Sequence, residues 1–558
     1  MAAHLLSIIT FMPLVGALVL LAFPKGNSPG ARGFALFISV LTFGVSLLLW
    51  QGFDASSSGL QFVERHPWVT MLGSSYLVGI DGLSLFLILL TTFLTPLIVL
   101  SSYSSVEDKA REYLFCMLIL ETAMLGTLIA QDLLLFYVFW EAMLIPMYFL
   151  IGIFGGKNRI YATLKFFIFT MSGSMLMLVA IIFLYLHTPG RTFELAAMTK
   201  ANLPLETQYY LFGAFALAFA IKVPMFPLHT WLPDAHTEAP TGGSVILAGV
   251  MLKMGTYGFL RFAMPLFPRA AFHFLPLIAT LAVVGIVYGA LVAMIQKDIK
   301  KLVAYTSVSH LGFVMLGIAA MSTAGVSGAV YQMLNHGIST GALFLLVGVI
   351  YERRHTRAIK DFGGLAKVMP VYAAVFLIVG LSSIGLPGLN GFVGEFMIMA
   401  GTIKSQFIGG LLPFGGPGAF YVLMAGLGVI FAAVYMLWMY QRVFFGEVTH
   451  PENNKLKDLS ARELLIFAPL LALIVIMGVA PRIFLAPMEP SLQRIVSDFQ
   501  AANGVAPQAA QVGRPSFPLN QARPVDAPLR LMPPPQHQPQ PLPLQMPMQA
   551  HPVAPVKD

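Results

Sequence analysis

Long apolar runs, separated by short polar connections, fill most of the chain. A membrane-spanning helix needs about 20 mostly apolar residues, and about fourteen runs meet that length. They extend approximately over residues 4–23, 32–50, 81–103, 112–130, 132–154, 160–186, 209–226, 244–267, 275–295, 302–321, 327–351, 371–403, 419–442 and 463–479. The pattern predicts an all-α polytopic membrane protein with about 14 transmembrane helices.

Two of these runs are interrupted at matching places, over residues 221–227 and 384–391. Proline removes a backbone donor and clashes with the preceding turn, so the freed carbonyl groups must be buried in protein or face a water-filled cavity. Broken helices in corresponding positions of two halves are typical of transporters with inverted repeats. We therefore expect two inverted five-helix repeats, each with a broken helix.

This reading divides the chain into five parts. Residues 1–111 form three transmembrane helices, 112–267 the first antiporter-like repeat and 268–446 the second repeat. Residues 447–496 hold the last transmembrane helix and its flanks. From residue 497 the composition changes to Pro, Gln and Ala, which predicts a tail that is disordered or draped on a partner.

Charge is sparse and unevenly placed. The chain is 57% hydrophobic and 10% charged, with a net charge of +8. Basic residues gather on alternate connections, which indicates topology rather than binding of nucleic acid. The rule that cytoplasmic loops are positive places Lys297, Lys300 and Lys301 inside and Arg261 and Arg269 outside. Both termini are then expected on the outer (periplasmic) side of a bacterial inner membrane.

The sequence contains no motif that is typical of a redox site. The single cysteine, Cys116, lies inside a predicted span, so neither a disulfide framework nor a Cys-based zinc or iron–sulfur site is expected. The chain has no Gly-rich phosphate loop between a strand and a helix and no nucleophile elbow. His229 and His236 belong to a His- and acid-containing stretch, but Pro233 and Pro240 break any helical ligand face there, so no metal is predicted.

Four charged residues lie at membrane depth, where each costs about 2.5–3.5 kcal/mol on insertion scales. Glu141 sits well inside its predicted helix, Lys222 precedes the first break, Lys253 lies near the middle of the next helix, and Glu395 follows the second break. Such residues mark ion pathways by default. Glu121 and Lys165 are also intramembrane, but they rank lower because Lys165 can extend towards the nearby cytoplasmic boundary.

Two histidines, His310 and His336, lie between the lysines and Glu395 in the sequence. Histidine titrates near neutrality, so both are candidate proton relays. An opposite charge favours the ammonium form of a lysine and burial disfavours it, so the opening of a Glu141–Lys222 pair would release a proton towards Lys253, the histidines and Glu395. The alternative is structural: a buried ion pair that fixes helix packing, with core histidines hydrogen-bonded to neighbours such as Asn335.

The residues that carry this pattern resemble those of a known family. Phe139-Trp140-Glu141, the stretch from Lys222-Val223-Pro224 to Asp234-Ala235-His236, and Lys253-Met254-Gly255 are similar to motifs of the antiporter-like subunits of proton-pumping NADH:quinone oxidoreductase, respiratory complex I. The resemblance covers roughly residues 1–479. Most of these subunits carry Lys where this chain has Glu395, and a Glu there favours the branch called subunit M.

The resemblance implies a role in proton translocation. Glu141, Lys222, Lys253 and Glu395 would form a central hydrophilic axis with His310 and His336 as relays. NADH, FMN, iron–sulfur clusters and quinone would be bound by partner subunits, with none of them and no metal on this chain. The expected partners are the other membrane subunits, including neighbouring antiporter-like subunits, and the lipid bilayer.

Two alternatives remain open. The chain could be a subunit of a cation/proton antiporter or of a membrane-bound hydrogenase, or its buried polar residues could have a purely structural role in a scaffold subunit.

Overall fold

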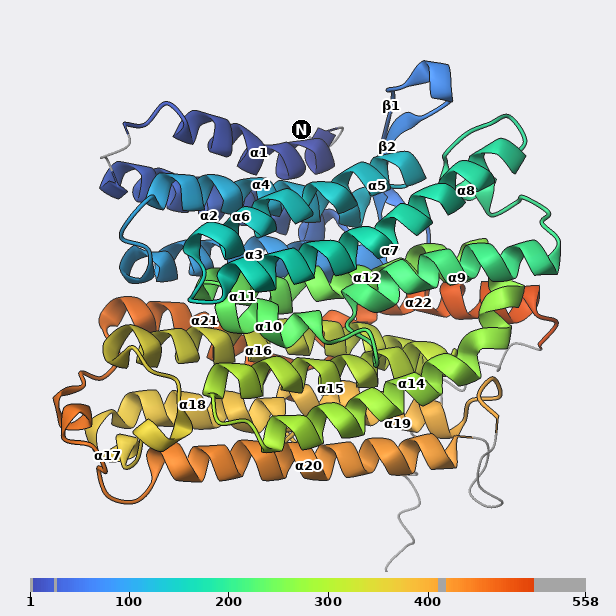
Figure 1. Ribbon diagram of the computed structural model, residues 1–558. Helices are drawn as coiled ribbons and strands as arrows, with labels where there is room; N and C mark the ends of the chain where they lie inside the picture. The colour runs from blue at the N-terminus through green and yellow to red at the C-terminus, as the bar shows by residue number, and fades with distance from the viewer. Residues whose placement is uncertain (1–3, 25–27, 410–417, 506–558) are drawn as a thin grey trace, which may run out of the picture. The chain divides into compact units, whose positions relative to one another are not determined.

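The computed structural model describes residues 4–24, 28–409 and 418–505 of the 558-residue chain. Long helices that lie side by side make up most of this part (Figure 1). Within it, eleven helices are long and apolar enough to cross a membrane, and Leu5–Leu20 and Pro370–Ser383 are shorter apolar helices. Each of the fourteen predicted segments contains a helix, which confirms the polytopic all-α membrane fold.

Three helices and a hairpin form the N-terminal part. The helices are α1 (Leu5–Leu20), α2 (Ser28–Gly52) and α3 (Gly82–Ser105). Strands β1 (Gln61–Pro67) and β2 (Ser75–Ile80) pair antiparallel between α2 and α3, an element that the sequence analysis did not predict. The hairpin projects from one end of the helices, which we call the hairpin end (Figure 1).

The next set of helices contains the first break. It comprises α4 (Ala110–Ile129), α5 (Leu133–Ala142), α6 (Leu144–Phe154), α7 (Arg159–His187), α9 (Leu205–Lys222), α10 (Trp231–Glu238), α11 (Thr241–Ile246), α12 (Leu252–Gly258) and α13 (Met264–Leu266). Two π-helical turns, η3 (Leu247–Met251) and η4 (Phe259–Ala263), join α11, α12 and α13 into one apolar run.

One predicted helix of this set is divided. The segment expected over residues 132–154 separates into α5 and α6 at Met143. Pro146 explains the division, because its ring lacks an N–H and crowds the carbonyl group four residues earlier. Glu141 therefore sits at the end of α5, beside the discontinuity.

The second set of helices contains the second break. It comprises α14 (Pro268–Met294), α15 (Ile299–Ala319), α16 (Thr323–Arg354), α18 (Pro370–Ser383), α19 (Asn390–Ile403) and α20 (Ala419–Phe444). The predicted break lies between α18 and α19, where Gly385 and Gly388 have φ angles of +76° and +91° that other residues rarely adopt. Both predicted broken helices are thus confirmed, whereas the exact repeat boundaries 112–267 and 268–446 stay predictions.

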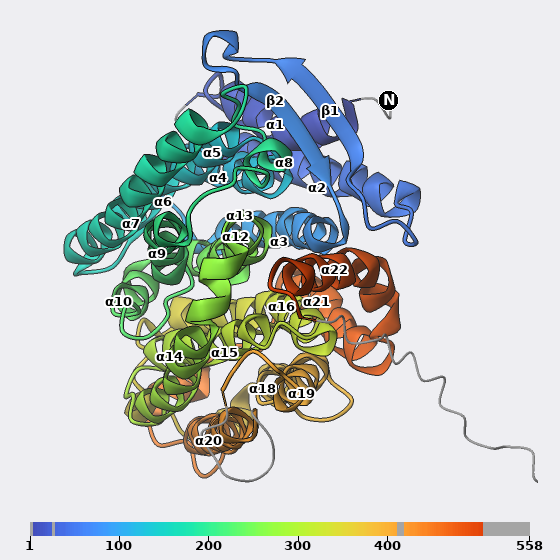
Figure 2. The same ribbon diagram turned by 90° about the vertical axis from the view of Figure 1, so that its right-hand side faces the viewer.

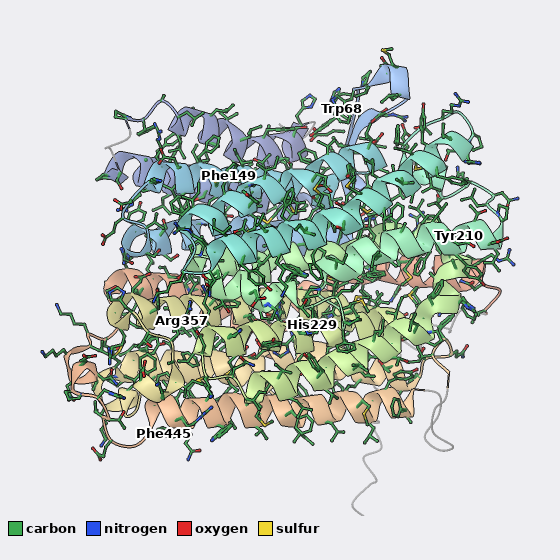
Figure 3. All side chains as sticks on the ribbon, in the orientation of Figure 1. Trp68, Phe149, Tyr210, His229, Arg357 and Phe445 are labelled. Atoms are coloured by element: carbon green, nitrogen blue, oxygen red, sulfur yellow. The ribbon has the colours of Figure 1, made fainter. Side chains whose placement is uncertain are left out.

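Helix α16 forms the centre of the packing. Every residue from Gly325 to Ile350 is buried, and α3, α15 and α19 surround it in the end-on view (Figure 2). Peripheral helices instead expose large apolar side chains, among them Phe149 and Tyr210 (Figure 3). An exposed apolar surface of this kind is what lipid contact requires.

The C-terminal part holds one expected and one unexpected helix. After α21 (Ala461–Val479) the chain forms α22 (Arg482–Ala502), which packs on α3 and α16. The predicted start of the Pro/Gln-rich tail at residue 497 is therefore wrong, because the helix continues to Ala502. Residues 506–558, the rest of that predicted tail, lie outside the described residues.

Short elements complete the described chain. They are η2 (Thr70–Leu72), α8 (Leu195–Met198), η5 (Ile359–Asp361), α17 (Leu365–Val368) and η6 (Pro451–Lys455).

Gly255 permits a close approach between α12 and the first broken helix. A Cβ atom built on Gly255 would lie 2.7 Å from the Phe219 carbonyl oxygen and 2.6 Å from Val223 Cγ2. A backbone carbonyl cannot move aside as a flexible side chain can, so the two helices touch here through backbone atoms. This contact fixes α12 beside the end of α9.

We predict that Gly255→Ala destabilises the protein by about 1–3 kcal/mol, the usual range for overpacking a close-packed core. The assembled fraction on native gels and the thermal unfolding of the detergent-solubilised protein measure the effect. Gly426→Ala is the matched control, because a Cβ at Gly426 on α20 meets nothing within 4 Å. Equal stability of the two variants would contradict the contact described above.

Candidate functional site

Lys253 is the central buried charge of the molecule. Its side chain lies within the apolar run Thr241–Leu266 and has no solvent exposure. Its Nζ donates a hydrogen bond to the carbonyl oxygen of Ala248 and lies 2.6 Å from Nδ1 of His336 on α16. Ala248 belongs to the π-helical turn η3, five residues before Lys253, and π turns of this kind are frequent at functional sites. Two predicted site residues are therefore in direct contact.

A second pair lies at the second break. His310 Nδ1 on α15 is 3.1 Å from Oε1 of Glu395 on α19, and both side chains are buried. Gln332 donates to the same carboxylate oxygen at 3.0 Å, and the Ser383 hydroxyl lies 3.2 Å from His310 Nε2. Ser383 is the last residue of α18, so the break itself supplies a partner to the histidine.

The two pairs adjoin. The ring centroids of His310 and His336 are 5.8 Å apart, and the Nε2 atom of His336 is buried with no hydrogen-bond partner in the described part of the chain. Polar side chains that include Asn335 and Ser339 line a narrow cavity of about 10 Å³ beside both rings. A small cavity lined by polar groups is a place where water can bridge unsatisfied atoms. Lys253, His336, His310 and Glu395 thus form one buried polar cluster.

Asn390 holds the second break in place. Its backbone carbonyl accepts a hydrogen bond from Asn335 at 2.8 Å, and its side-chain oxygen accepts one from Ser382 at 2.5 Å. Its amide group donates to the Ser339 hydroxyl at 3.2 Å. Asn390 begins α19 and is fully buried, so a single side chain ties α16, α18 and α19 together.

At the first break, Lys222 ends α9 and is 1% exposed. Its Nζ lies 4.9 Å from the centre of the Trp140 ring, a cation–π distance, and has no hydrogen-bond partner among the described residues. The expected pair with Glu141 is only an electrostatic interaction at longer range, because no ion pair within 4.0 Å joins the two side chains. Glu141 Oε1 is likewise buried without a hydrogen bond.

The first break is stabilised by an indole rather than an amide. Trp231, the first residue of α10, donates from Nε1 to the carbonyl oxygen of Ile221 at 2.9 Å. This bond satisfies one of the carbonyl groups freed where α9 ends. Gly255, two residues after Lys253, packs on the same end of α9, which brings the two lysine-bearing segments side by side.

His236 is a functional candidate that the sequence analysis missed. It lies on α10, has no solvent exposure, and neither ring nitrogen has a hydrogen-bond partner in the described chain. Its ring stacks on Phe344 at 4.6 Å, and the charges of Lys253 and Lys300 both act on it. The sequence analysis weighed this residue only as a metal ligand. The available signal in the sequence was its position directly after the first break, among residues that were already candidates.

Three basic residues differ from their expected settings. Lys300, assigned to a cytoplasmic connection, is buried and donates to the Ala239 carbonyl at 2.5 Å. Arg261, assigned to an outer connection, is buried in an ion pair with Asp81. Lys165, expected to extend towards the boundary, pairs with Asp234 at 2.7 Å. Charge counting along the sequence does not distinguish a loop residue from one that folds back between helices.

Glu121 and His229 stand apart from the cluster. Both Glu121 oxygens are buried without a hydrogen-bond partner in the described chain. His229 lies near the middle of the length of the helices (Figure 3), packed against Phe226 and Tyr288. Among the described residues, no group of three or more His, Cys, Asp or Glu side chains could hold a metal ion.

Comparisons with known proteins agree over nearly the whole described chain. Residues 130–415 match the family model described as NADH:quinone oxidoreductase/Mrp antiporter, TM, and residues 34–131 match that of NADH-ubiquinone oxidoreductase chain 4, amino terminus. NADH-quinone oxidoreductase subunit M of Rhodobacter capsulatus is 46% identical over 522 residues, which cover 91% of this chain and 99% of that protein. NADH-ubiquinone oxidoreductase chain 4 of Marchantia polymorpha is 41% identical over 492 residues, covering 88% and 97%.

Solved structures give the same result. A chain of respiratory complex I from Thermus thermophilus with bound NADH matches with a TM-score of 0.80 and 34% identity, covering 89% of this chain and 100% of that one. A chain of the archaeal membrane-bound sulfane sulfur reductase matches at 0.74 with 27% identity, covering 85% and 76%. A chain of the Mrp complex from Dietzia sp. matches at 0.76 with 19% identity, covering 90% and 99%, which shows a shared fold alone.

We predict that Asn390→Ala lowers stability by about 1–3 kcal/mol per buried polar group left unpaired, because Ser339 and Ser382 both lose a partner. The Asn335 bond to the backbone carbonyl of residue 390 survives the substitution, so the loss comes from the side-chain bonds. Thermal unfolding of the solubilised protein measures it. Asn454→Ala, at an exposed position in η6, is the control and should match the wild type. An unchanged unfolding temperature for Asn390→Ala would contradict its role as an anchor.

Proposed function

The chain belongs to the family of NADH-quinone oxidoreductase subunit M, and we propose that its buried Lys, His and Glu residues are the route by which it moves protons across the membrane. It is a multi-pass, antiporter-like membrane subunit of an oxidoreductase complex. In this proposal NADH, FMN, iron–sulfur clusters and quinone are bound by partner subunits, and their electron transfer drives proton movement in this chain.

The observation that carries the proposal is the cluster of Lys253, His336, His310 and Glu395. Four titratable side chains follow one another within the membrane-spanning bundle, in two direct contacts of 2.6 and 3.1 Å. A purely structural polar core would need its hydrogen bonds satisfied, yet His336 Nε2 has no partner in the described chain. An unsatisfied ring nitrogen beside a polar cavity suits a proton relay better than a helix anchor.

Pairing controls where the proton resides. A proton on Lys253 makes its ammonium group a donor to His336, and loss of that proton leaves the His336 ring free to take one up. The next transfer, to His310, needs a bridging water or a ring rotation, because the ring centroids are 5.8 Å apart. His310 can then pass the proton to Glu395, whose carboxylate is held by Gln332.

Lys222 is the switchable member of the route. It faces the π surface of Trp140, and no ion pair within 4.0 Å binds it to Glu141. A modest approach of the two side chains would close the ion pair and retain the proton on Lys222, and their separation would release it. In this proposal, partner subunits act on the chain by changing that distance.

Sidedness and partners follow from the same proposal. The cytoplasmic side carries most basic connections, so both termini and the hairpin end face the outer side of a bacterial inner membrane. The lateral neighbours in the assembled complex are other membrane subunits, including antiporter-like ones. The rival assignments, a subunit of a cation/proton antiporter or of a membrane-bound hydrogenase, share the fold and differ in partners and ions.

We predict that Lys222→Ala and Glu141→Ala each abolish or sharply reduce proton pumping while the complex still assembles. The loss follows because the remaining group has no charge to pair with in the low-dielectric interior. Proton uptake into proteoliposomes per NADH oxidised by the purified complex is the measurement. Lys200→Ala, at an exposed position, is the control. Full proton pumping by a well-assembled Lys222→Ala complex would contradict the role assigned to Lys222.

Isolation of the complex separates the rival assignments. We expect gentle solubilisation of the native membranes to recover this chain together with flavin and iron–sulfur subunits and NADH:quinone activity. Mass spectrometry identifies the partners. Nickel-site subunits would instead indicate a hydrogenase, whereas membrane subunits alone with sodium-dependent proton exchange would indicate a cation/proton antiporter.

A further inference from the structure

A buried ion pair closes the hairpin end of the helix that carries Lys253. Arg261 donates from Nη1 to Asp81 Oδ2 at 2.8 Å and from Nη2 to Asp81 Oδ1 at 2.5 Å, a bidentate arrangement. Asp81 directly follows β2, and its Oδ1 also accepts a hydrogen bond from the backbone N–H of Leu83 in the first turn of α3. Both charged side chains are less than a tenth exposed.

Tyr257 links this pair to the interior. Its hydroxyl accepts a hydrogen bond from Arg261 Nε at 3.1 Å and donates to the Leu128 carbonyl at 2.9 Å. The Ser84 hydroxyl lies 3.3 Å from the same oxygen and 3.3 Å from Arg261 Nη2. A protonatable carboxylate, a hydroxyl relay and a fixed cation therefore share one buried site, which the route through Lys253 and Glu395 does not use.

The site lies on the same helix face as Lys253. Lys253, Tyr257 and Arg261 follow one another at intervals of four residues, which places their side chains above one another along a helix. The π-helical turns η3 and η4 lie on either side of α12, and Arg261 is inside η4. Because a π turn inserts an extra residue, its movement along the helix rotates the side chains that it passes.

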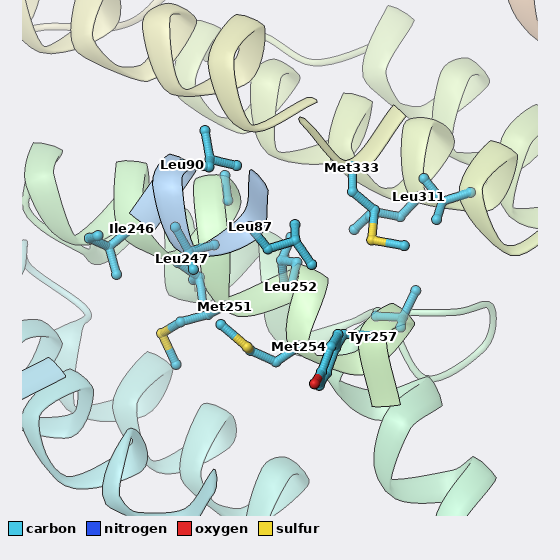
Figure 4. Close-up of a cluster of buried hydrophobic side chains, with 14 of the residues drawn as sticks. Leu87, Leu90, Ile246, Leu247, Met251, Leu252, Met254, Tyr257, Leu311 and Met333 are labelled. Atoms are coloured by element: carbon cyan, nitrogen blue, oxygen red, sulfur yellow. The ribbon is translucent and has the colours of Figure 1, made fainter. Parts of the chain in front are cut away.

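A layer of buried apolar side chains lies one helical turn from each site. Thr256 contacts Met333 Sδ at 3.0 Å, one turn of α16 before His336, and Leu87 lies one turn of α3 beyond Ser84. Met333 and Leu87 are 0% and 2% exposed. Figure 4 shows both side chains in a cluster of buried hydrophobic side chains, together with Leu252 and Tyr257. Constrictions of this kind block ions by excluding water and open when they hydrate.

Helix α22 covers the outside of the pair. The Gly82 N–H donates to the Ser491 hydroxyl at 2.9 Å, and a Cβ on Gly82 would lie 2.6 Å from the Pro487 carbonyl oxygen. Gly82 is the neighbour of Asp81, so α22 packs directly beside the pair.

We propose that Asp81, Arg261 and Tyr257 form the closed end of a second proton exit, which runs from Lys253 along α12 to the hairpin end. The Arg261 guanidinium locks Asp81 as a carboxylate, and the apolar layer keeps water from Lys253. Rotation of η4 would withdraw Arg261, after which Asp81 accepts a proton relayed through the Tyr257 hydroxyl and releases it at the hairpin end. The proposal rests on the proton-translocating function proposed above.

The test is passive proton leak in proteoliposomes of the purified whole complex, measured under an imposed membrane potential without NADH. We expect Arg261→Gln, which frees the Asp81 carboxylate, to raise the leak several-fold and to lower the protons pumped per NADH, with NADH oxidation maintained. Asp81→Asn instead removes the proton acceptor and should leave the complex tight. Asn is also a good helix N-cap, so the Asp81→Asn substitution spares the start of α3. Addition of Asp81→Asn or Tyr257→Phe to Arg261→Gln should return the leak towards the wild-type value, because the proton acceptor or the hydroxyl relay is then gone.

The matched control is an ion pair at the opposite end. Arg353 binds Glu463 by two bonds of 2.7 Å, with the same bidentate geometry as Arg261 and Asp81. Glu463→Gln should lower stability without a rise in leak. A purely structural role for the pair would make the Arg261→Gln/Asp81→Asn complex at least as leaky as Arg261→Gln, and this result would overturn the proposal.

Milder variants keep the test decisive if the first ones fail to assemble. Asp81→Glu and Arg261→Lys retain both charges but lose the bidentate fit, so a smaller rise in leak is expected. If these assembled complexes leak and pump protons like the wild type, that result would also overturn the proposed exit. Lys222→Ala separates the two proposals: if it abolishes pumping while every Asp81 and Arg261 complex stays tight, the exit fails and the translocating function stands.

Discussion

The structure depends on one constraint: a charge or free backbone group inside a bilayer must find its partner within the protein. Lys253 costs about 2.5–3.5 kcal/mol at this depth if it stays unpaired. The cost is offset by His336 and by the Ala248 carbonyl that the π turn η3 brings within reach. His336 and Gln332 both come from α16, whose central residues are all buried, so the helix that carries the polar partners is also the helix around which the others pack.

The two breaks meet this constraint in different ways, and the difference bears on function. The second break is tied by Asn390 to α16 and α18, and its Glu395 has two hydrogen-bond partners. The first break is closed by the Trp231 indole, while Lys222 meets only an aromatic face. A charge held by directional hydrogen bonds stays in one place, whereas a charge held by a cation–π contact can exchange partners at lower cost. The asymmetry is consistent with a switch at Lys222 and a fixed acceptor at Glu395.

The length of the apolar runs and the helix breakers predicted most of the fold, because an apolar run in a bilayer must form a helix that satisfies its own backbone, and proline interrupts it. The breaks beside Lys222 and Glu395 were predictable for this reason. The hairpin and α22 were not, because they lie outside the apolar runs and depend on contacts such as Ser491 with Gly82. The division of α5 from α6 had a local signal in Pro146 that a search for long apolar runs overlooks.

The candidate site was predictable in its members but not in its connections. Residue type and depth identify Lys253, His310, His336 and Glu395, yet their pairing depends on which faces of α12, α15, α16 and α19 meet. His236, Lys300 and Arg261 were misjudged because sequence position near a connection says nothing about whether a side chain turns inward. Each of the three is buried.

The π turns connect the centre of the bundle with its hairpin end. Bidentate pairing in a low-dielectric interior is strong while both partners are in place, and removal of one leaves the other as an unpaired buried charge. Such a pair has no stable half-open state: either Arg261 holds Asp81, or water must enter to solvate both. Because η3 presents the Ala248 carbonyl to Lys253 and η4 carries Arg261, a shift of either turn along the helix alters the surroundings of a buried cation. One helix thereby has the means to link the protonation of Lys253 to the closure of the hairpin end.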